Sequence, residues 1–232
     1  MSVFRPVELP CPDCGAAVRF EVVASVNADR APAFRAAIVA ESFQREACPA
    51  CGTTFRVEPS FSLIDHGRRI WVAALPLAER ARWQAAEARA GETFERAYGV
   101  RASTTIRAIG AELRKRIVFG WGALREKLVC DDLGLDDTTL ELTKIAVLGS
   151  ASSAPLGRDT ELRLQGAGEG KLQFAWLAVS SEVPLEWLSV ERAAYDEIAA
   201  DAGGDWAELR ADLGSGAAYV DMNRLIITAA PA

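Results

Sequence analysis

Four of the five cysteines stand in two copies of one short motif. Residues 11–14 read CPDC, residues 48–51 read CPAC, and a glycine follows each copy directly. Thiolates are soft ligands that suit zinc, and two such turns can deliver four sulfurs to the corners of a tetrahedron. The proline pre-sets φ in each turn, and the glycine permits a positive φ after the second cysteine. We therefore predict that one zinc ion is bound, in a closed structural site, by Cys11, Cys14, Cys48 and Cys51.

Three other uses of these cysteines stay open at this point. Disulfide bonds are one, although they are rare in a reducing compartment. A rubredoxin-like iron site uses similar turns and would imply electron transfer. A metal-free redox dithiol is the third, but two symmetric copies of the motif favour four ligands on one ion.

No other group of residues indicates catalysis. The only histidine, His66, lies in LIDHGRR, which we interpret as the tip of a hairpin rather than as a ligand or a general base. We find no pairing of a nucleophile with a base, so we assign no catalytic residues and expect no enzyme. Helix caps and a solvated loop explain the acidic residues Asp131, Asp132, Asp136 and Asp137 better than a second metal site does. We expect the fifth cysteine, Cys130, to be buried and inert.

The charge is unevenly distributed along the chain. The net charge is −6, residues 101–127 hold seven basic and two acidic residues, and residues 128–232 hold seven basic and 18 acidic residues. A nucleic-acid-binding protein usually has a basic face. Only the first of these segments qualifies, and its candidate phosphate-binding residues are Arg107, Arg114, Lys115 and Arg116. The acidic remainder disfavours nucleic acid as the partner.

Hydrophobic periodicity predicts an α+β fold. We expect strands over 16–26 and within 53–76, with a short helix between them that begins just after Asp29. Residues 77–99 predict a helix with an apolar stripe of Trp83, Ala86, Ala90 and Phe94. The later predicted elements are a strand (116–120), two helices (121–134 and 135–149), a hairpin (160–180), a strand (185–190), a helix (191–203) and a final strand (217–227).

These elements suggest three regions. Residues 1–76 form an N-terminal zinc-ribbon β domain, residues 77–148 form a helical segment that continues it, and residues 149–232 form a smaller α+β part. The small residues of 149–157 mark the last boundary. Leu124, Leu128, Leu135, Leu140 and Leu142 should line the faces on which the two central helices pack.

The paired motifs, together with CPACGTTFRVEPSFSLIDHGRRIWVAALP, resemble the bacterial CpXC domain, a family named for its two Cys-Pro-x-Cys motifs. The later segment RIVFGWGALREKLVCDDLGLDDTTLELTK is also similar to that family, so the resemblance covers residues 8–145. It implies a zinc-ribbon-like fold in which Cys11, Cys14, Cys48 and Cys51 are the metal ligands. It implies no catalytic residue.

The function expected from these observations is that of a zinc-stabilised, non-enzymatic module that binds other proteins. A nucleic-acid-associated zinc ribbon is the alternative, and a rubredoxin-like iron protein for electron transfer is a further one. The sequence contains no stretch of about 18 apolar residues, and its first residues lack a basic region followed by an apolar run. We therefore expect a cytoplasmic protein without a membrane span.

Overall fold

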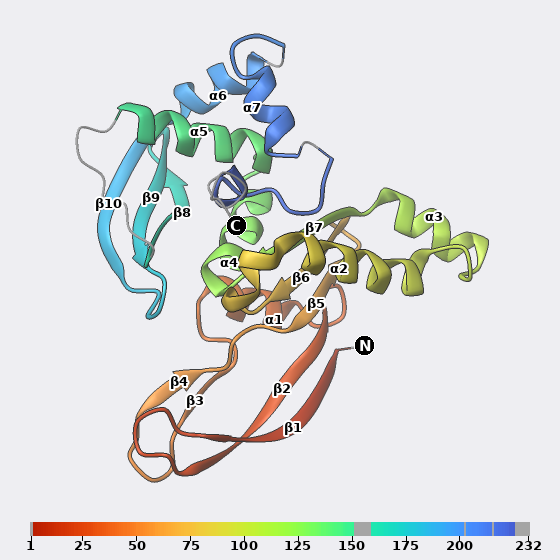
Figure 1. Cartoon of the computed structure of the whole chain (residues 1–232), viewed down its shortest axis with the longest axis vertical. Coiled ribbons are helices and arrows are strands. Elements are labelled where there is room, and N and C mark those ends of the chain that lie inside the picture. The colour runs from red at the N-terminus through yellow and green to blue at the C-terminus, as the bar shows by residue number, and fades with distance from the viewer. Residues whose placement is uncertain (1, 151–158, 202, 215, 226–232) are drawn as a thin grey trace. The chain divides into compact units, whose positions relative to one another are not determined.

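The computed structural model describes residues 2–150, 159–201, 203–214 and 216–225. The chain divides into two compact units, Met1–Leu124 and Arg125–Ala232, and each is described by itself. Both contain helices and strands, so the fold is α+β as predicted, and the cysteine motifs lie among the N-terminal strands (Figure 1). The boundaries expected after residues 76 and 148 lie inside these two units.

The first unit is built on a mixed five-stranded sheet of order β1-β2-β5-β6-β7. Its strands are β1 (Val3–Pro10), β2 (Ala17–Asn27), β5 (Phe61–Asp65), β6 (Ile70–Leu75) and β7 (Arg114–Phe119). β1 pairs antiparallel with β2, and β5 pairs antiparallel with β6, whereas β2–β5 and β6–β7 are parallel pairs. β6 reads as an unbroken apolar run and its first five residues are buried, as expected for a strand covered on both faces.

Helices connect the strands of this sheet. They are α1 (Pro32–Val39), the 3₁₀ helix η1 (Leu77–Arg82), α2 (Trp83–Tyr98), α3 (Thr104–Glu112) and the first residues of α4 (Trp121–Asp132). The predicted stripe of α2 is confirmed, because Trp83, Ala86, Ala90 and Phe94 are all buried. The ring of Phe94 meets that of Trp71 on β6 at a centroid distance of 5.4 Å, so this stripe packs on the sheet.

A small two-stranded ribbon, β3 (Arg45–Ala47) and β4 (Thr54–Arg56), carries the second cysteine motif. Gln44, just before β3, ties it to β2, because its side chain accepts from the Val23 N–H and donates to the Glu21 carbonyl. Beyond β4, Trp121 Nε1 donates to the Val57 carbonyl at 2.8 Å. These side chains fix the ribbon to the large sheet where no strand pairing does so.

The second unit holds a three-stranded antiparallel sheet of order β10-β9-β8. Its elements are α5 (Asp137–Ser150), β8 (Thr160–Gly168), β9 (Lys171–Ala178), β10 (Pro184–Glu191), α6 (Arg192–Ala200) and α7 (Ala207–Asp212). The predicted hairpin is confirmed as β8–β9. Its two turn residues, Glu169 and Gly170, both have positive φ, which matches the right-handed twist of the flanking strands.

One sequence expectation in this unit is wrong. The described residues 217–225 of the predicted final strand are irregular and then helical, because Tyr219, Val220 and Asp221 are buried as coil rather than paired as a strand. Helix α6 buries Tyr195 and Ile198. Most of the predicted small-residue loop, and the end of the predicted final strand, lie outside the described residues.

The core of the second unit contains a network of charged side chains that the sequence did not indicate. Among the described residues of this unit, eight acidic and basic side chains are less than 9% exposed: Glu126, Lys127, Asp137, Glu141, Lys144, Glu161, Arg163 and Asp221. The Arg163 guanidinium contacts carboxylates of Glu126, Glu161 and Asp221 at 2.6–2.8 Å. Buried charges require such partners, since an unpaired one loses its hydration without compensation.

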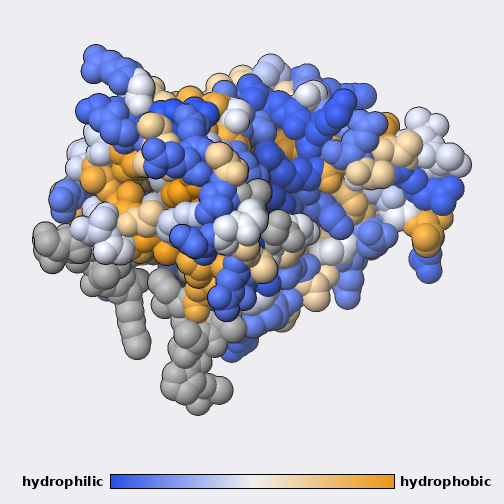
Figure 2. Space-filling model, turned by 90° about the horizontal axis from the view of Figure 1, so that it is seen from above, coloured by the Kyte–Doolittle hydropathy of each residue, from blue (hydrophilic) through white to orange (hydrophobic). Residues whose placement is uncertain are grey.

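On the face drawn in Figure 2, hydrophilic residues alternate with patches of hydrophobic ones, and the larger hydrophobic patches lie on the left of the view. No helix in the described part of the chain is long and apolar enough to cross a membrane.

Candidate metal centre

Each cysteine motif folds into the same tight turn. In the first, the Gly15 N–H donates to the Cys11 carbonyl at 3.0 Å and the Cys11 N–H donates to the Ala16 carbonyl at 2.8 Å. In the second, the two bonds recur at the same offsets from Cys48, at 2.8 and 2.9 Å. The glycine after each motif has a φ of 73° or 78°, a conformation that side chains disfavour. The glycines are therefore needed for the turns, as predicted.

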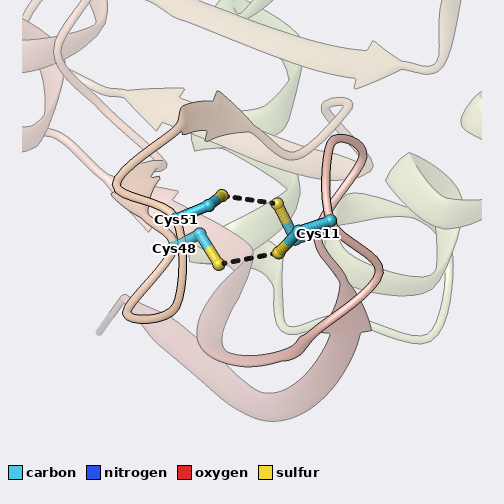
Figure 3. A group of neighbouring side chains, drawn as sticks. Cys11, Cys48 and Cys51 are labelled. Atoms are coloured by element: carbon cyan, nitrogen blue, oxygen red, sulfur yellow. Dashed lines mark hydrogen bonds between the residues drawn. The ribbon is translucent and has the colours of Figure 1, made fainter.

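The two turns face each other and bring four sulfurs together (Figure 3). The Sγ atoms of Cys11 and Cys51 are 3.7 Å apart, as are those of Cys14 and Cys48, and all four lie within 4.8 Å of one another. Four thiolates at about 2.3 Å from a zinc ion stand about 3.8 Å from each other at the corners of a tetrahedron. The donor set and its spacing therefore fit a single four-coordinate ion. All five cysteines are free.

The centre is half buried. Cys11 and Cys48, the first cysteine of each motif, are buried in a cluster with Val18 and Phe20 of β2, while Cys14 and Cys51 are exposed. The Phe20 ring also contacts Phe55 of β4 edge to face, with centroids 5.1 Å apart. The apolar cluster thus joins the β1–β2 hairpin to the β3–β4 ribbon beneath the sulfurs.

A polar contact joins the two turns on the exposed side. The Thr53 hydroxyl, two residues after the second motif, donates to the Asp13 carboxylate at 3.0 Å. Because this bond spans 40 residues, it helps to hold the two pairs of ligands in register.

The crowding of four thiols disfavours their ionisation when no cation is bound. The Ala16 backbone N–H lowers the pKa of the Cys14 thiol, but the neighbouring thiols and desolvation raise it further, and the net result is a pKa of about 12. A divalent cation supplies the charge that makes the thiolate forms favourable, so metal binding releases protons.

Comparison with known proteins agrees with this site. The model of the CpXC protein family matches residues 9–144, which is more than half of the chain and includes all four clustered cysteines. The chain belongs to the CpXC family. No curated protein and no solved structure matches it significantly. The second unit lies for the most part beyond the matched residues, so the CpXC match describes the metal-centre unit and only the first helices of the second unit.

His66 lies at the β5–β6 turn, as predicted, and away from the sulfurs. Its Nδ1 is 2.7 Å from the Asp29 carboxylate, which also accepts the backbone N–H groups of His66 and Gly67. These hydrogen bonds lower the pKa of Asp29 against the opposing effect of desolvation. The histidine therefore ties the end of β2 to this turn.

The four candidate phosphate-binding residues do not share one face. Arg107 is exposed on α3, whereas the other three lie on β7, where alternate side chains point to opposite sides. Lys115 is exposed with its Nζ 4.9 Å from the centroid of the Phe94 ring, and Arg116 is only 7% exposed and donates to the Lys115 carbonyl. The structure therefore presents two of the four to solvent without gathering them.

The acidic residues 131–137 are not brought together as ligands. Asp136 caps α5, since its Oδ1 accepts from the Thr139 N–H at 2.8 Å, as we expected of a residue at this position. Asp137 is buried and pairs with Lys127 Nζ at 3.1 Å. The sequence analysis did not predict this buried ion pair, because a lysine ten residues before an aspartate is not a pattern that indicates one. Cys130 is buried, with its Sγ 3.4 Å from the Leu135 carbonyl, as predicted.

Proposed function

We propose that this chain is a zinc-stabilised module that acts by binding other proteins. The observation that carries the metal half of the proposal is the placement of four sulfurs within 4.8 Å of one another. A four-thiolate shell around zinc has no open position for a substrate, which is the arrangement of structural sites rather than catalytic ones. In such a site Cys11, Cys14, Cys48 and Cys51 hold the ion, and the ion holds the β1–β2 hairpin against the β3–β4 ribbon.

The protein-binding half rests on charge and exposed apolar surface. Residues 125–232 carry nine basic and 19 acidic residues, a net charge of −10, whereas residues 1–124 carry 17 basic and 13 acidic residues, a net charge of +4. Strong charge of one sign on a unit steers a partner of the opposite sign toward it. Large apolar side chains also stand exposed on the second unit, where a partner would cover them.

Nucleic acid is the second candidate, supported by the positive charge of the first unit. Four thiolates and one divalent ion together contribute −2, so the metal-bound unit would fall from +4 to +2. That is a weak charge for phosphate binding, and the buried position of Arg116 reduces the available basic surface further. Titration with a DNA or RNA duplex at 50 and 200 mM salt tests this candidate, because phosphate contacts weaken steeply with salt.

Elemental analysis of protein purified without added metal tests the proposed zinc. We expect one zinc per chain. Iron in its place would give a coloured protein and support electron transfer, since the same four sulfurs suit both ions. Chemical cross-linking in the native host, followed by capture of the metal-bound chain, then tests the protein-binding role. If no protein is cross-linked above the level of an unrelated acidic control, the module does not act through protein partners.

A further inference from the structure

Strand β10 has one side without a strand partner in the described part of the chain. It forms an edge of the three-stranded sheet and pairs only with β9. Just beyond it, the Arg192 N–H donates to the Gly170 carbonyl at 2.9 Å. Alternate residue pairs of an antiparallel ladder exchange hydrogen bonds, so this bond sets the phase for the strand. Val190 and Leu188, two and four residues earlier, are therefore the ones that bond to β9.

The intervening residues direct their backbone groups the other way. Trp187, Ser189 and Glu191 lie opposite β9 in the non-bonded pairs, so their N–H groups point to the open side, as do the C=O groups of Trp187 and Ser189. The Glu191 C=O instead starts the hydrogen bonding of α6, because Glu191 is the N-cap of that helix. An exposed row of such groups is a template for one more strand. The usual protections, a proline and a bulge, are both present in β10, but they stand at its beginning, between Pro184 and Glu186. They leave the second half of the edge open.

The same strand concentrates exposed apolar surface. Of the six large hydrophobic residues that are exposed in the described chain, three lie within five positions here: Val183 at 53%, Leu185 at 55% and Trp187 at 61%. Val183 directly precedes β10 and Leu185 lies in its bulge, so the regular alternation of side chains along the strand begins after Leu185, with Trp187 on the exposed face. A tryptophan in this position supplies a large anchoring surface, as in many protein interfaces.

The charge of the unit indicates which kind of strand could pair with the open side of β10. The unit has a net charge of −10, and Glu186 is exposed on the strand itself. A second copy of the chain would bring the same negative charge to the contact. An extended segment with basic residues gains from that charge instead.

We propose that the open edge of β10 is a strand-addition site for an extended segment of a partner protein in which basic and apolar side chains alternate. This assignment rests on the proposed protein-binding function and gives it a location and a partner chemistry. The added strand bonds to the backbone groups of Trp187 and Ser189 and to the N–H of Glu191, and it packs its apolar side chains against Leu185 and Trp187.

The probe for the test is a fluorescein-labelled seven-residue peptide in which lysine and valine alternate, titrated with the full-length chain and followed by fluorescence anisotropy. A second peptide has the same sequence with every backbone nitrogen after the first residue methylated, so that neither edge of the peptide keeps its N–H donors. Methylation keeps the charge and the apolar side chains but removes the donors. We expect about fivefold weaker binding for each hydrogen bond lost.

Matched variants of Ser189 test the protein side of the same bond. Ser189→Pro removes an outward N–H, and proline is tolerated where an edge strand faces solvent. Ser189→Ala keeps that N–H. Both variants lose the hydrogen bond from the Ser189 hydroxyl to the Gln173 side chain, so this loss cancels in the comparison. We expect Ser189→Pro to weaken probe binding at least fivefold relative to Ser189→Ala, with matching circular dichroism spectra.

Three results would overturn the site. Equal binding of the plain and methylated peptides would mean that charge alone attracts the probe, and this comparison holds even if the proline variant does not fold. The same conclusion follows if Ser189→Pro binds as well as Ser189→Ala. Dimers that form at micromolar concentration and dissociate in the Trp187→Lys variant would make a second copy the occupant.

The site and the proposed function can fail separately. If a cross-linked protein partner is captured equally by the Ser189→Pro and Ser189→Ala chains, the protein-binding function stands and β10 is not its site. If the probe binds as expected but no protein is captured in the host, the edge is competent and the proposed function is wrong.

Discussion

Individual cysteines differ in what their removal should do. Cys11 is one of the four clustered cysteines that could hold a metal ion and also a buried part of the cluster around Phe20, whereas Cys130 lies outside that group. Structural zinc binding is coupled to folding, so a missing ligand is a stability defect before it is anything else.

We therefore expect Cys11→Ser to lose bound zinc and to unfold the first unit, while Cys130→Ala keeps one zinc per chain. Metal content measured beside hydrogen exchange over residues 2–124 checks both. A Cys11→Ser chain with the hydrogen-exchange protection of the parent would show that the site is not structural.

Metal affinity should also depend on pH. Because the crowded thiols raise the pKa of Cys14 to about 12 in the absence of metal, protons compete with the ion for the sulfurs. Zinc affinity, measured by competition with a chromogenic chelator, should fall as the pH is lowered from 8 to 6. An affinity that is constant over this range would mean that the thiols are already ionised before the metal arrives.

Local turns show which elements could be predicted from the sequence. The paired motifs carry their own proline and glycine, and the structure repeats the predicted turn twice with the same hydrogen bonds. β1 was missed because Pro6 and Pro10 argue against a strand, yet an edge strand tolerates proline where its N–H would face solvent. The apolar residues near 219 predicted a strand, but Asp221 is bound to Arg163, and no local pattern reports so distant a contact.

Two glycine substitutions should change stability in opposite directions. A Cβ at Gly15 or at Gly91 would meet no atom within 4 Å, so neither change produces a clash. Gly15 has a φ of 73°, and Gly15→Ala should cost about 1–2 kcal/mol in unfolding free energy. Gly91 lies inside α2, where Gly91→Ala should stabilise by up to about 1 kcal/mol. Chemical denaturation of the zinc-bound chain measures both free energies. A Gly15→Ala chain with the unfolding free energy of the parent would show that the backbone at residue 15 does not require glycine.

The buried charge network that joins the helices and strands of the second unit could not be predicted from the composition of the chain. Glu126 on α4 accepts from Lys144 on α5 and from Arg163 and the Leu164 N–H on β8, so one carboxylate joins two helices and a strand. Nothing in the spacing of these residues indicated that they would meet. Their burial could be learned only from the tertiary structure.

Glu126→Gln should therefore destabilise the second unit by about 3–5 kcal/mol, because it removes the one carboxylate that Lys144 and Arg163 share and places a neutral amide against these buried cations. The matched control is Arg192→Gln, which breaks an exposed pair with Asp196 and should cost less than about 1 kcal/mol. Thermal unfolding monitored by hydrogen exchange over residues 125–225 separates the two effects. Similar losses of stability in the two variants would mean that the buried network contributes no more to folding than an exposed ion pair does.

At the scale of the whole molecule, the two units should respond to different agents. In the second unit, the Arg163 and Lys144 charges overcome desolvation and hold the pKa values of Asp221 and Glu126 below their usual range. A lowered folded-state pKa gives stability that is present above the unfolded value of about 4 and is lost as the pH falls toward the folded one. Glu141 acts in the opposite sense, since burial raises its pKa and its contribution is lost as the pH rises.

A chelator at pH 7 should accordingly destabilise only the first unit, whereas acid should destabilise the second unit as the pH falls below about 4, in addition to displacing the metal from the first. Hydrogen exchange resolved by unit measures the two responses in one sample. The Asp221→Asn chain should start less stable and show a flatter pH dependence in that range. Equal loss of protection in both units on chelation would mean that they unfold as one.

The two units also differ in when their key partners become available during synthesis. All four clustered cysteines have been translated by residue 51, before β5, β6 and β7 of the same unit. In the second unit, Arg163 pairs with Asp221 and Lys127 donates to the carbonyl of Val220, and both of these partners are translated much later. The buried charge network of the second unit therefore cannot be complete until residue 221 has been translated, and a chain that stopped before residue 220 would leave Lys127 and Arg163 without these partners.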